Sequence, residues 1–246
     1  MYKSKYIFLS LALFSFLAVT STAFALHSPE HYTLFGEATY TAPGNASPRA
    51  VHLISDAAPG WAGVNYGIES GITFADIAAL STDYRFESDD SCGGGSPRFQ
   101  VNVVSPDSAD TGNIFVYIGP PPSYAGCPSS VWLGSGDLLE GANPVDTSQL
   151  DSGTFYDPYA AALVKYGAYT VTGIQLVADA GWAFGDGEQA LDVDNTLIDA
   201  TLFTYEIPVP ADKDECKNGG WMNMGRPDGS TFKNQGDCVS FVEAGK

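Results

Sequence analysis

The chain has 246 residues, with 11 basic and 29 acidic side chains, a formal net charge of −18, and 44% hydrophobic and 13% aromatic residues. This apolar content is enough for a large core and excludes a disordered chain. The acidic excess disfavours nucleic acid and anionic membrane surfaces as partners, because both are negatively charged and would be repelled.

Residues 1–25 have the pattern of a secretory signal peptide. Lys3 and Lys5 form a basic start, the apolar run at 7–19 is short for a membrane span, and Ala23-Phe24-Ala25 fits the small-x-small cleavage rule. Cleavage would leave nine basic residues against 29 acidic ones. No later apolar stretch reaches spanning length, so we expect a protein secreted to the exterior or held at the cell surface, without a transmembrane segment after signal removal.

The pattern that follows is typical of an antiparallel jelly-roll β-sandwich. Short runs of Val, Ile, Phe, Tyr and Thr are separated by Gly, Pro, Asn, Asp and Ser. The apolar Phe99, Val101 and Val103 should face the core. Their polar neighbours Arg98 and Gln100 then face outward. We expect strands at residues 33–40, 50–55, 62–68, 79–87, 98–104, 113–118, 131–132, 172–178 and 196–206.

One short crossover helix is expected within the sandwich, over residues 157–166. Asp157 can cap its first amides, Pro158 suits the first helical position, and Gly167 can end it in a left-handed conformation. A stripe at helical spacing should pack on the edge of the sandwich. The residues of this stripe are Tyr159, Leu163 and Tyr166.

The composition changes at Pro208-Val209-Pro210, a stiff connector whose prolines cannot donate to a sheet. We therefore expect a β-sandwich domain over residues 26–207 and a linker with a small appendage over 208–246. A short helical turn should carry Cys216, and a helix over 235–244 should carry Cys238. The large apolar side chains available to the appendage are Trp221, Phe232 and Phe241.

The four cysteines form two pairs that are local in sequence. In an oxidising compartment an even number of cysteines favours disulfides over free thiols or a metal site. Of the three connectivities, we expect Cys92 with Cys127 and Cys216 with Cys238, since each bridge then stays within one unit. The appendage is too small to fold on its apolar groups alone, so its disulfide should replace much of a core.

Two resemblances follow from particular segments. The runs Cys216–Trp221 and Phe232–Val242 resemble a cassette at the ends of many uncharacterised secreted bacterial proteins, which implies a transferable module for surface retention or assembly. The segments Trp61–Val64, Asp90–Phe99 and Leu191–Asn195 resemble those of concanavalin-like and carbohydrate-binding jelly-roll modules. That resemblance implies a jelly-roll architecture, and such folds host many functions.

The sequence contains no constellation that stands out for catalysis. A serine-type triad would have to use His52, whose neighbours Ser55 and Asp56 lie on the same strand and point to alternating faces. Concanavalin-type glycoside hydrolases carry Glu-x-Asp-x-x-Glu on one strand, and here Ala190 stands in place of the nucleophile. A hydrolase that uses the nearby acids is the least favoured hypothesis.

Those acids suit a structural calcium ion better than catalysis, because Ca²⁺ takes carboxylate and carbonyl oxygens on a tight loop. The turn at Gly185-Asp186-Gly187-Glu188 is followed closely by two more carboxylates, although the spacing fits no EF-hand loop. The candidate ligands are Asp186, Glu188, Asp192 and Asp194.

Sugar recognition needs exposed aromatic rings beside polar groups, and several rings lie in or next to Gly/Pro-rich segments. The candidate ligand-binding residues are Trp61, Tyr66, Tyr124, Trp132 and Trp182. We expect Tyr124 to stand out on the polyproline loop at 119–127, although each ring has packing in the core as its alternative. The favoured hypothesis is a non-catalytic module that binds a polysaccharide or surface glycan. The alternative is a structural or adhesive surface protein.

Overall fold

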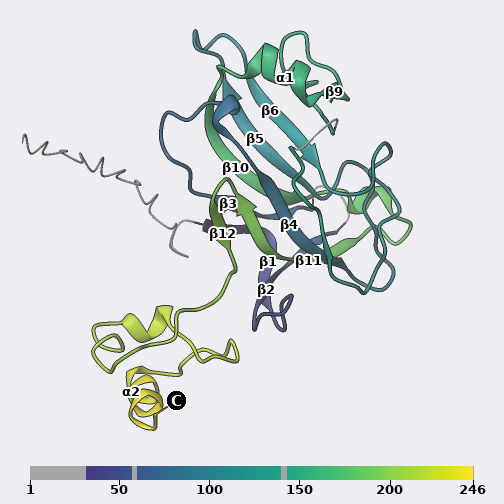
Figure 1. Cartoon of the computed structure of the whole chain (residues 1–246). Helices are drawn as coiled ribbons and strands as arrows, with labels where there is room; N and C mark the ends of the chain where they lie inside the picture. Colours follow the sequence, from purple (N-terminus) through teal and green to yellow (C-terminus); the bar gives the residue numbers. More distant parts are fainter. Residues whose placement is uncertain (1–31, 57–59, 140–142, 246) are drawn as a thin grey trace, which may run out of the picture.

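The computed structural model describes residues 32–56, 60–139 and 143–245, and the expected signal peptide lies outside the described residues. The described chain is mainly β and forms an antiparallel jelly-roll sandwich (Figure 1). The strands are β1 (Tyr32–Thr41), β2 (Ala50–Ser55), β3 (Ala62–Tyr66), β4 (Leu80–Phe86), β5 (Arg98–Val104), β6 (Thr111–Tyr117), β7 (Leu133–Gly134), β8 (Pro144–Val145), β9 (Asp157–Pro158), β10 (Thr170–Ala178), β11 (Gln189–Ile198) and β12 (Thr201–Phe203). The helices are α1 (Tyr159–Tyr166), α2 (Gln235–Glu243) and the 3₁₀ turns η2 (Phe74–Asp76), η3 (Gly181–Ala183) and η4 (Gly220–Asn223).

One curled sheet runs in the order β6-β5-β10-β3-β1-β2-β11-β4-β7, with β12 beside β11. The first half of β1, residues 32–36, pairs with β3, and the second half, residues 37–41, pairs with β2. Layer A consists of β6, β5, β10, β3 and the first half of β1. The second half of β1 with β2, β11, β4 and β7 is layer B. The strand β1 therefore belongs to both layers.

Gly36 lies where β1 passes from one layer to the other. Its φ is +63°, and a Cβ at this position would lie 1.9 Å from the carbonyl oxygen of Trp61. The next amide, that of Glu37, donates to the same Trp61 oxygen at 3.1 Å. Only glycine fits both the left-handed backbone and this close approach, so Gly36 permits the bend that curls the sheet.

The core fills the space between the two layers. Phe99, Val101 and Val103 of β5 are buried, which confirms the alternation predicted from the sequence. They belong to one cluster with Leu53 and Val193 of layer B. Burying one such side chain stabilises the fold by about 1.5–3 kcal/mol, so this shared cluster holds the layers together.

Most of the longer strands agree closely with the sequence-based prediction. The strand predicted over 131–132 is wrong, because β7 begins at Leu133, and the short strands β8 and β9 are not predicted by the sequence. β2 and β5 have the predicted bounds. The sequence predicts a last strand over 196–206, whereas β11 begins at Gln189 and β12 is a separate strand. In the sequence, Asp192 and Asp194 are typical of a loop. In the structure they belong to β11, where they alternate with Leu191 and Val193, which face the core.

The helix α1 confirms the predicted position but not the predicted caps. Asp157 belongs to β9, and its carboxylate accepts hydrogen bonds from Thr147 Oγ1 at 3.0 Å and Lys165 Nζ at 2.7 Å. Pro158 is therefore the N-cap residue, without a side-chain cap, and Gly167 is right-handed with a φ of −54°. The predicted stripe does pack on the core, through Tyr159, Leu163 and Tyr166.

Both predicted disulfides are confirmed. Cys92 is bonded to Cys127, and Cys216 to Cys238, each with an S–S distance of 2.01 Å. The second bridge forms a separate small core with the buried Phe232, against which Trp221 and Phe241 pack. Figure 1 shows this C-terminal appendage at the end of an extended connector. Its Gly229 lies close to the loop at 42–49, since a Cβ at Gly229 would lie 3.3 Å from the carbonyl oxygen of Pro48.

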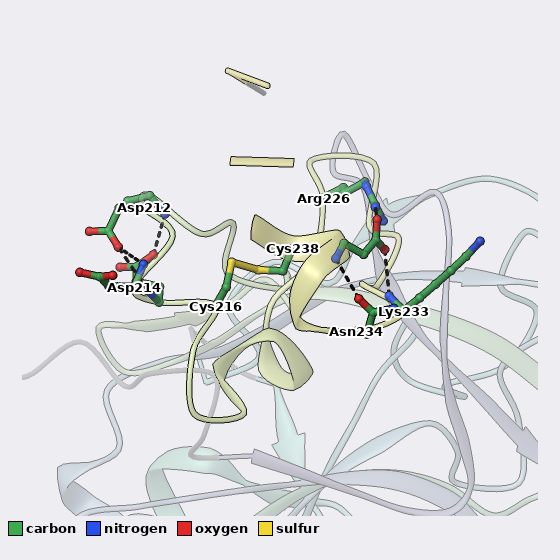
Figure 2. Close-up of a disulfide and its surroundings, with 10 residues drawn as sticks. Asp212, Asp214, Cys216, Arg226, Lys233, Asn234 and Cys238 are labelled. Carbon is green, nitrogen blue, oxygen red and sulfur yellow. Dashed lines mark hydrogen bonds and ion pairs between the residues drawn. A yellow bond between two sulfur atoms is a disulfide. The ribbon is translucent and has the colours of Figure 1, made fainter. Parts of the chain in front are cut away.

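The described appendage contains the 3₁₀ turn η4 and the α-helix α2, and the start of α2 is fixed by side chains of the appendage (Figure 2). Asn234 Oδ1 accepts a hydrogen bond from the amide of Asp237 at 2.9 Å, and Asp237 pairs with Arg226 at 2.8 Å. The expected short turn that carries Cys216 is present as a hydrogen-bonded turn over residues 213–219, and the amide of Glu215 donates to Asp212 Oδ1 at 3.2 Å. Within the described ranges, no helix combines the length and the apolar character needed to cross a membrane.

Candidate functional site

The outer face of layer A contains a hollow with a volume of about 380 Å³. Gln100 and Gln175 belong to this face because they alternate with buried residues on β5 and β10. Trp61 and Trp182, two of the predicted ligand-binding rings, both line the hollow. The other lining residues are Phe35, Gly60, Gln100, Gln175, Val177 and Asp179.

A row of amide side chains crosses this face. The register places Gln175 opposite Asn65 on one side and opposite Gln100 on the other. Gln100 Nε2 donates to Gln175 Oε1 at 3.0 Å, and Gln175 Nε2 donates to Asn65 Oδ1. Asn65 Nδ2 in turn donates to Thr33 Oγ1 at 3.4 Å. Each amide carries two N–H donors and two lone pairs, so the row is ordered internally and keeps hydrogen-bonding capacity for a ligand.

Trp61 and Trp182 expose their rings although their backbones are held firmly. The exposed fractions of these residues are 49% for Trp61 and 63% for Trp182. The Trp61 carbonyl accepts the amide of Glu37 from β1. The Gly181 amide, one residue before Trp182, donates to the buried Ser55 Oγ at 3.0 Å. Exposed indoles on a fixed backbone can stack on a ligand without ordering a flexible loop.

A small apolar surface lies between the two indoles and the amides. Phe35 on β1 and Val177 on β10 flank Gly63, which is paired with both. A Cβ at Gly63 would lie 2.4 Å from Cζ of Phe35, so the phenyl ring occupies the space above this glycine. The absence of a side chain at Gly63 therefore leaves room for the Phe35 ring, which lines the hollow.

An ion pair closes one side of the hollow. Arg98 Nη1 and Nη2 donate to the two carboxylate oxygens of Asp179, each at 2.6 Å. Arg98 also donates to the carbonyl of Gly95 at 2.9 Å and to Gln100 Oε1 at 3.3 Å. Its guanidinium lies 4.8 Å from the ring centre of Phe115. These contacts fix Arg98 and connect the ion pair to the amide row.

Tyr66 and Tyr124 do not form part of this surface. Tyr66 is packed in the core, which is the alternative to a binding role, and the expectation that Tyr124 stands out on its loop is wrong. Tyr66 is 4% exposed and its hydroxyl lies 2.5 Å from that of the buried Tyr205. Tyr124 is 5% exposed, with its ring centre 5.4 Å from that of Tyr117 and 6.4 Å from that of Tyr156. The prolines of this loop are exposed, but the Tyr124 side chain turns inward and packs on its neighbours instead of standing out.

Trp132 lies on the other side of the molecule, next to layer B. The guanidinium of Arg85 on β4 lies 4.9 Å from its ring centre, and Trp132 itself is half-buried. Of the five predicted rings, the structure therefore brings Trp61 and Trp182 together and leaves Trp132 apart from them.

Asp192 is bound by two side chains across layer B. His52 Nδ1 lies 2.8 Å from its Oδ1, and Arg85 Nε donates to its Oδ2 at 3.1 Å. Burial raises the pKa of Asp192, but the hydrogen bonds from His52 and Arg85 outweigh it and the net pKa lies below its usual value. The same hydrogen bond raises the pKa of His52. Asp192 therefore has the contacts of a structural carboxylate.

Asp194 is fully buried and is also occupied by protein donors. The Asn45 amide donates to its Oδ2 at 2.8 Å and Ser47 Oγ at 2.6 Å, while burial raises its pKa. Asp186 and Glu188 lie on the exposed loop before β11. In the part of the chain that the structure describes, no group of three or more His, Cys, Asp or Glu side chains is arranged to hold a metal ion. Neither Asp192 nor Asp194 is open to a glycan substrate.

The remaining residues of the hollow are not identified as a site by the sequence. The alternation on β5 does place Gln100 on the outer face. Its proximity to Gln175 and Asn65 follows from the strand order β5-β10-β3, which joins segments some 35 to 110 residues apart in sequence. Phe35 and Asp179 carry no signal of their own.

No protein-family model matches the chain, and no curated protein matches it. Among solved structures it is similar to the family 11 carbohydrate-binding module of the cellulosomal cellulase Lic26A-Cel5E of Clostridium thermocellum, at 12% identity and a TM-score of 0.38, over 68% of this chain and 86% of that one. A family 11 module from Clostridium thermocellum in complex with a β-1,3-1,4-mixed-linked tetrasaccharide matches at 13% identity and a TM-score of 0.35, over 70% and 88% of the two chains. An exo-β-agarase matches at 12% identity and a TM-score of 0.37, over 76% of this chain and 26% of the agarase.

Proposed function

We propose that the chain is a non-catalytic binding module that acts outside the cell and holds a polysaccharide or surface glycan in the hollow of layer A. The observation that carries this proposal is the placement of two exposed indoles, Trp61 and Trp182, beside the amide row. Sugar rings have apolar C–H faces that stack on aromatic rings, and hydroxyls that need directional donors and acceptors. The hollow offers both kinds of contact on one face.

The rigidity of the surface supports the same proposal. Gln100 and Gln175 are held by each other and by β-strands, so a ligand would not have to order them. Immobilising a flexible side chain on binding costs roughly 0.5–1.5 kcal/mol, which this arrangement largely avoids. The two disulfides agree with an oxidising exterior compartment.

Retention on a panel of immobilised polysaccharides tests the proposal. Trp61→Ala and Trp182→Ala should each lower the affinity for a retained polymer by tenfold or more, a loss of about 1.4 kcal/mol or greater. Trp132→Ala is the matched control, because it removes an indole next to layer B. Equal retention by the wild type and both hollow variants would disprove the assigned site.

The same samples test the hydrolase hypothesis when soluble reducing ends are measured after binding. We expect no product release. Release that is abolished by Asp192→Asn would instead support catalysis through that carboxylate, although its contacts with His52 and Arg85 argue against this role.

A structural or adhesive surface protein is the second candidate, and the appendage favours it. This unit has its own disulfide-centred core, apart from that of the sandwich. A chain without residues 211–246 should keep glycan retention. Loss of association with the cell surface in that shortened chain would show that the appendage, and not the hollow, anchors the protein.

A further inference from the structure

We propose that the hollow selects an uncharged glycan and rejects both acidic and cationic ones; this inference rests on the proposed function. It starts from the ion pair at the edge of the hollow. Asp179 is the charged residue that lines the hollow, and both of its oxygens accept hydrogen bonds from Arg98. The charges of the two residues therefore compensate each other at the site.

An acidic ligand finds no available cation there. The Arg98 side chain is 13% exposed, and Nη1 and Nη2 are already directed at Asp179, Gly95 and Gln100. Its Nε is buried. A uronate or sulfate group placed in the hollow would lose water without gaining a charged donor, which disfavours its binding.

The other basic side chains described in the sandwich do not supply a free cation for an acidic ligand either. Arg85 is paired with Asp192, and Lys165 with Asp157. The Arg49 guanidinium lies over the Tyr40 ring, 3.4 Å from its centre. With a net charge of −18 for the chain, the long-range field also repels a polyanion before it reaches the hollow.

A cationic ligand is rejected at the same site for a different reason. The carboxylate of Asp179 would attract an ammonium group if it were free, but the guanidinium of Arg98 already occupies it. An amino sugar would therefore meet a compensated pair and a nearby positive charge. Gln100, Gln175 and Asn65 are neutral and offer both donors and acceptors, which matches the hydroxyls of an uncharged sugar.

The test uses families of polymers that share a backbone and differ in charge. We would compare hydroxyethyl cellulose with its carboxymethyl and quaternary-ammonium counterparts, arabinoxylan with glucuronoxylan, and agarose with carrageenan. At about 0.15 M salt, long-range attraction to the acidic protein is largely screened. We expect retention only on uncharged members. Equal or tighter retention on a charged member overturns this inference and leaves the proposed function in place, whereas no retention on any polymer overturns both.

A charge variant tests the selectivity through a gain of binding to an acidic polymer. Asp179→Asn leaves the Arg98 cation uncompensated at the hollow, so retention on the acidic member of the bound family should rise by fivefold or more. Asp214→Asn is the matched control, because it changes net charge equally and frees Lys217 in the appendage, 2.6 Å from Asp214. An equal rise in both variants overturns the local explanation.

A second variant keeps the test decisive if Asp179→Asn does not fold, which thermal unfolding would show. Arg98→Gln releases the Asp179 carboxylate and should instead raise retention on the quaternary-ammonium polymer. Unchanged selectivity in a folded form of either variant contradicts the role assigned to the pair.

Discussion

The indole of Trp182 lies against the backbone of Gly94, a residue 88 positions earlier in the chain. Gly94 has a φ of +61°, and a Cβ at this position would lie 3.6 Å from Cζ2 of Trp182 and 3.0 Å from the Cβ atoms of Ala180 and Ala183. The glycine run beside Cys92 therefore forms the surface on which η3 rests. The loop thus positions a ring of the hollow without lining the hollow itself.

This contact predicts that Gly94→Ala weakens glycan binding without touching the ligand. The new methyl group would push η3 and displace Trp182, and we expect a several-fold loss of retention. Gly136→Ala is the matched control, since Gly136 has a similar φ of +65° and a Cβ there would meet no atom of the described residues within 4 Å. Both variants carry the strain of a left-handed alanine, about 1 kcal/mol. Equal retention by the two would show that Gly94 does not position Trp182.

Much of the fold could be predicted because alternation is visible in a single strand. Phe99 and Val103 identify the core side of β5 without any knowledge of its neighbours. The same rule failed for β11, because the outward Asp192 and Asp194 resemble loop residues until their partners on β2 and on the loop at 42–49 are known. A strand is hard to recognise when tertiary hydrogen bonds satisfy its polar face.

The candidate site was less accessible from sequence than the fold. Exposure of Trp61 and Trp182 was expected, but the same argument selected Tyr66 and Tyr124, which are buried. Glycine and proline next to a ring show that the backbone turns, and they do not show whether it turns toward the core. The amide row forms because β10, which carries Gln175, lies between β5 and β3. This strand order is not visible in the sequence.

The Cys216–Cys238 bridge should stabilise the appendage without affecting the stability of the sandwich. Closing a loop of this length contributes about 3 kcal/mol in the chain-entropy description, and the appendage has few other buried groups. A Cys216→Ala and Cys238→Ala double variant should therefore lose hydrogen-exchange protection in α2 while β5 and β10 keep theirs. Loss of protection in the sandwich strands as well would show that the two cores fold as one unit.

The contact between His52 and Asp192 predicts a pH-dependent contribution to stability. The hydrogen bond to Asp192 raises the pKa of folded His52, with Glu87 and Glu188 adding to the rise. A raised folded pKa stabilises the protein fully below the unfolded pKa, and this stabilisation is lost as the pH rises through the folded value. His52→Gln should therefore lower the unfolding free energy more at about pH 5.5 than at about pH 8.5.

Urea unfolding at the two pH values measures this difference. Arg85 also contacts Asp192 and stays charged throughout, so it does not produce the pH dependence. Thr39 lies opposite His52 on β1 and does not titrate, which makes Thr39→Ala a suitable control. If His52→Gln destabilises the protein equally at both pH values, protonated His52 does not form a stabilising ion pair with Asp192.

A chain of buried hydroxyls makes Tyr205 a sensitive position for stability. Its hydroxyl lies 2.5 Å from that of Tyr66 and 2.7 Å from Thr196 Oγ1, and Tyr205 is 1% exposed. Tyr205→Phe keeps the ring but leaves these partners short of a hydrogen bond in a dry core, so we expect a loss of about 1–3 kcal/mol. Tyr40→Phe removes an exposed hydroxyl and should cost under about 0.5 kcal/mol in the same urea titration. Equal costs would mean that water reaches Tyr205, because a solvated hydroxyl group can exchange a protein partner for a water molecule at little net cost.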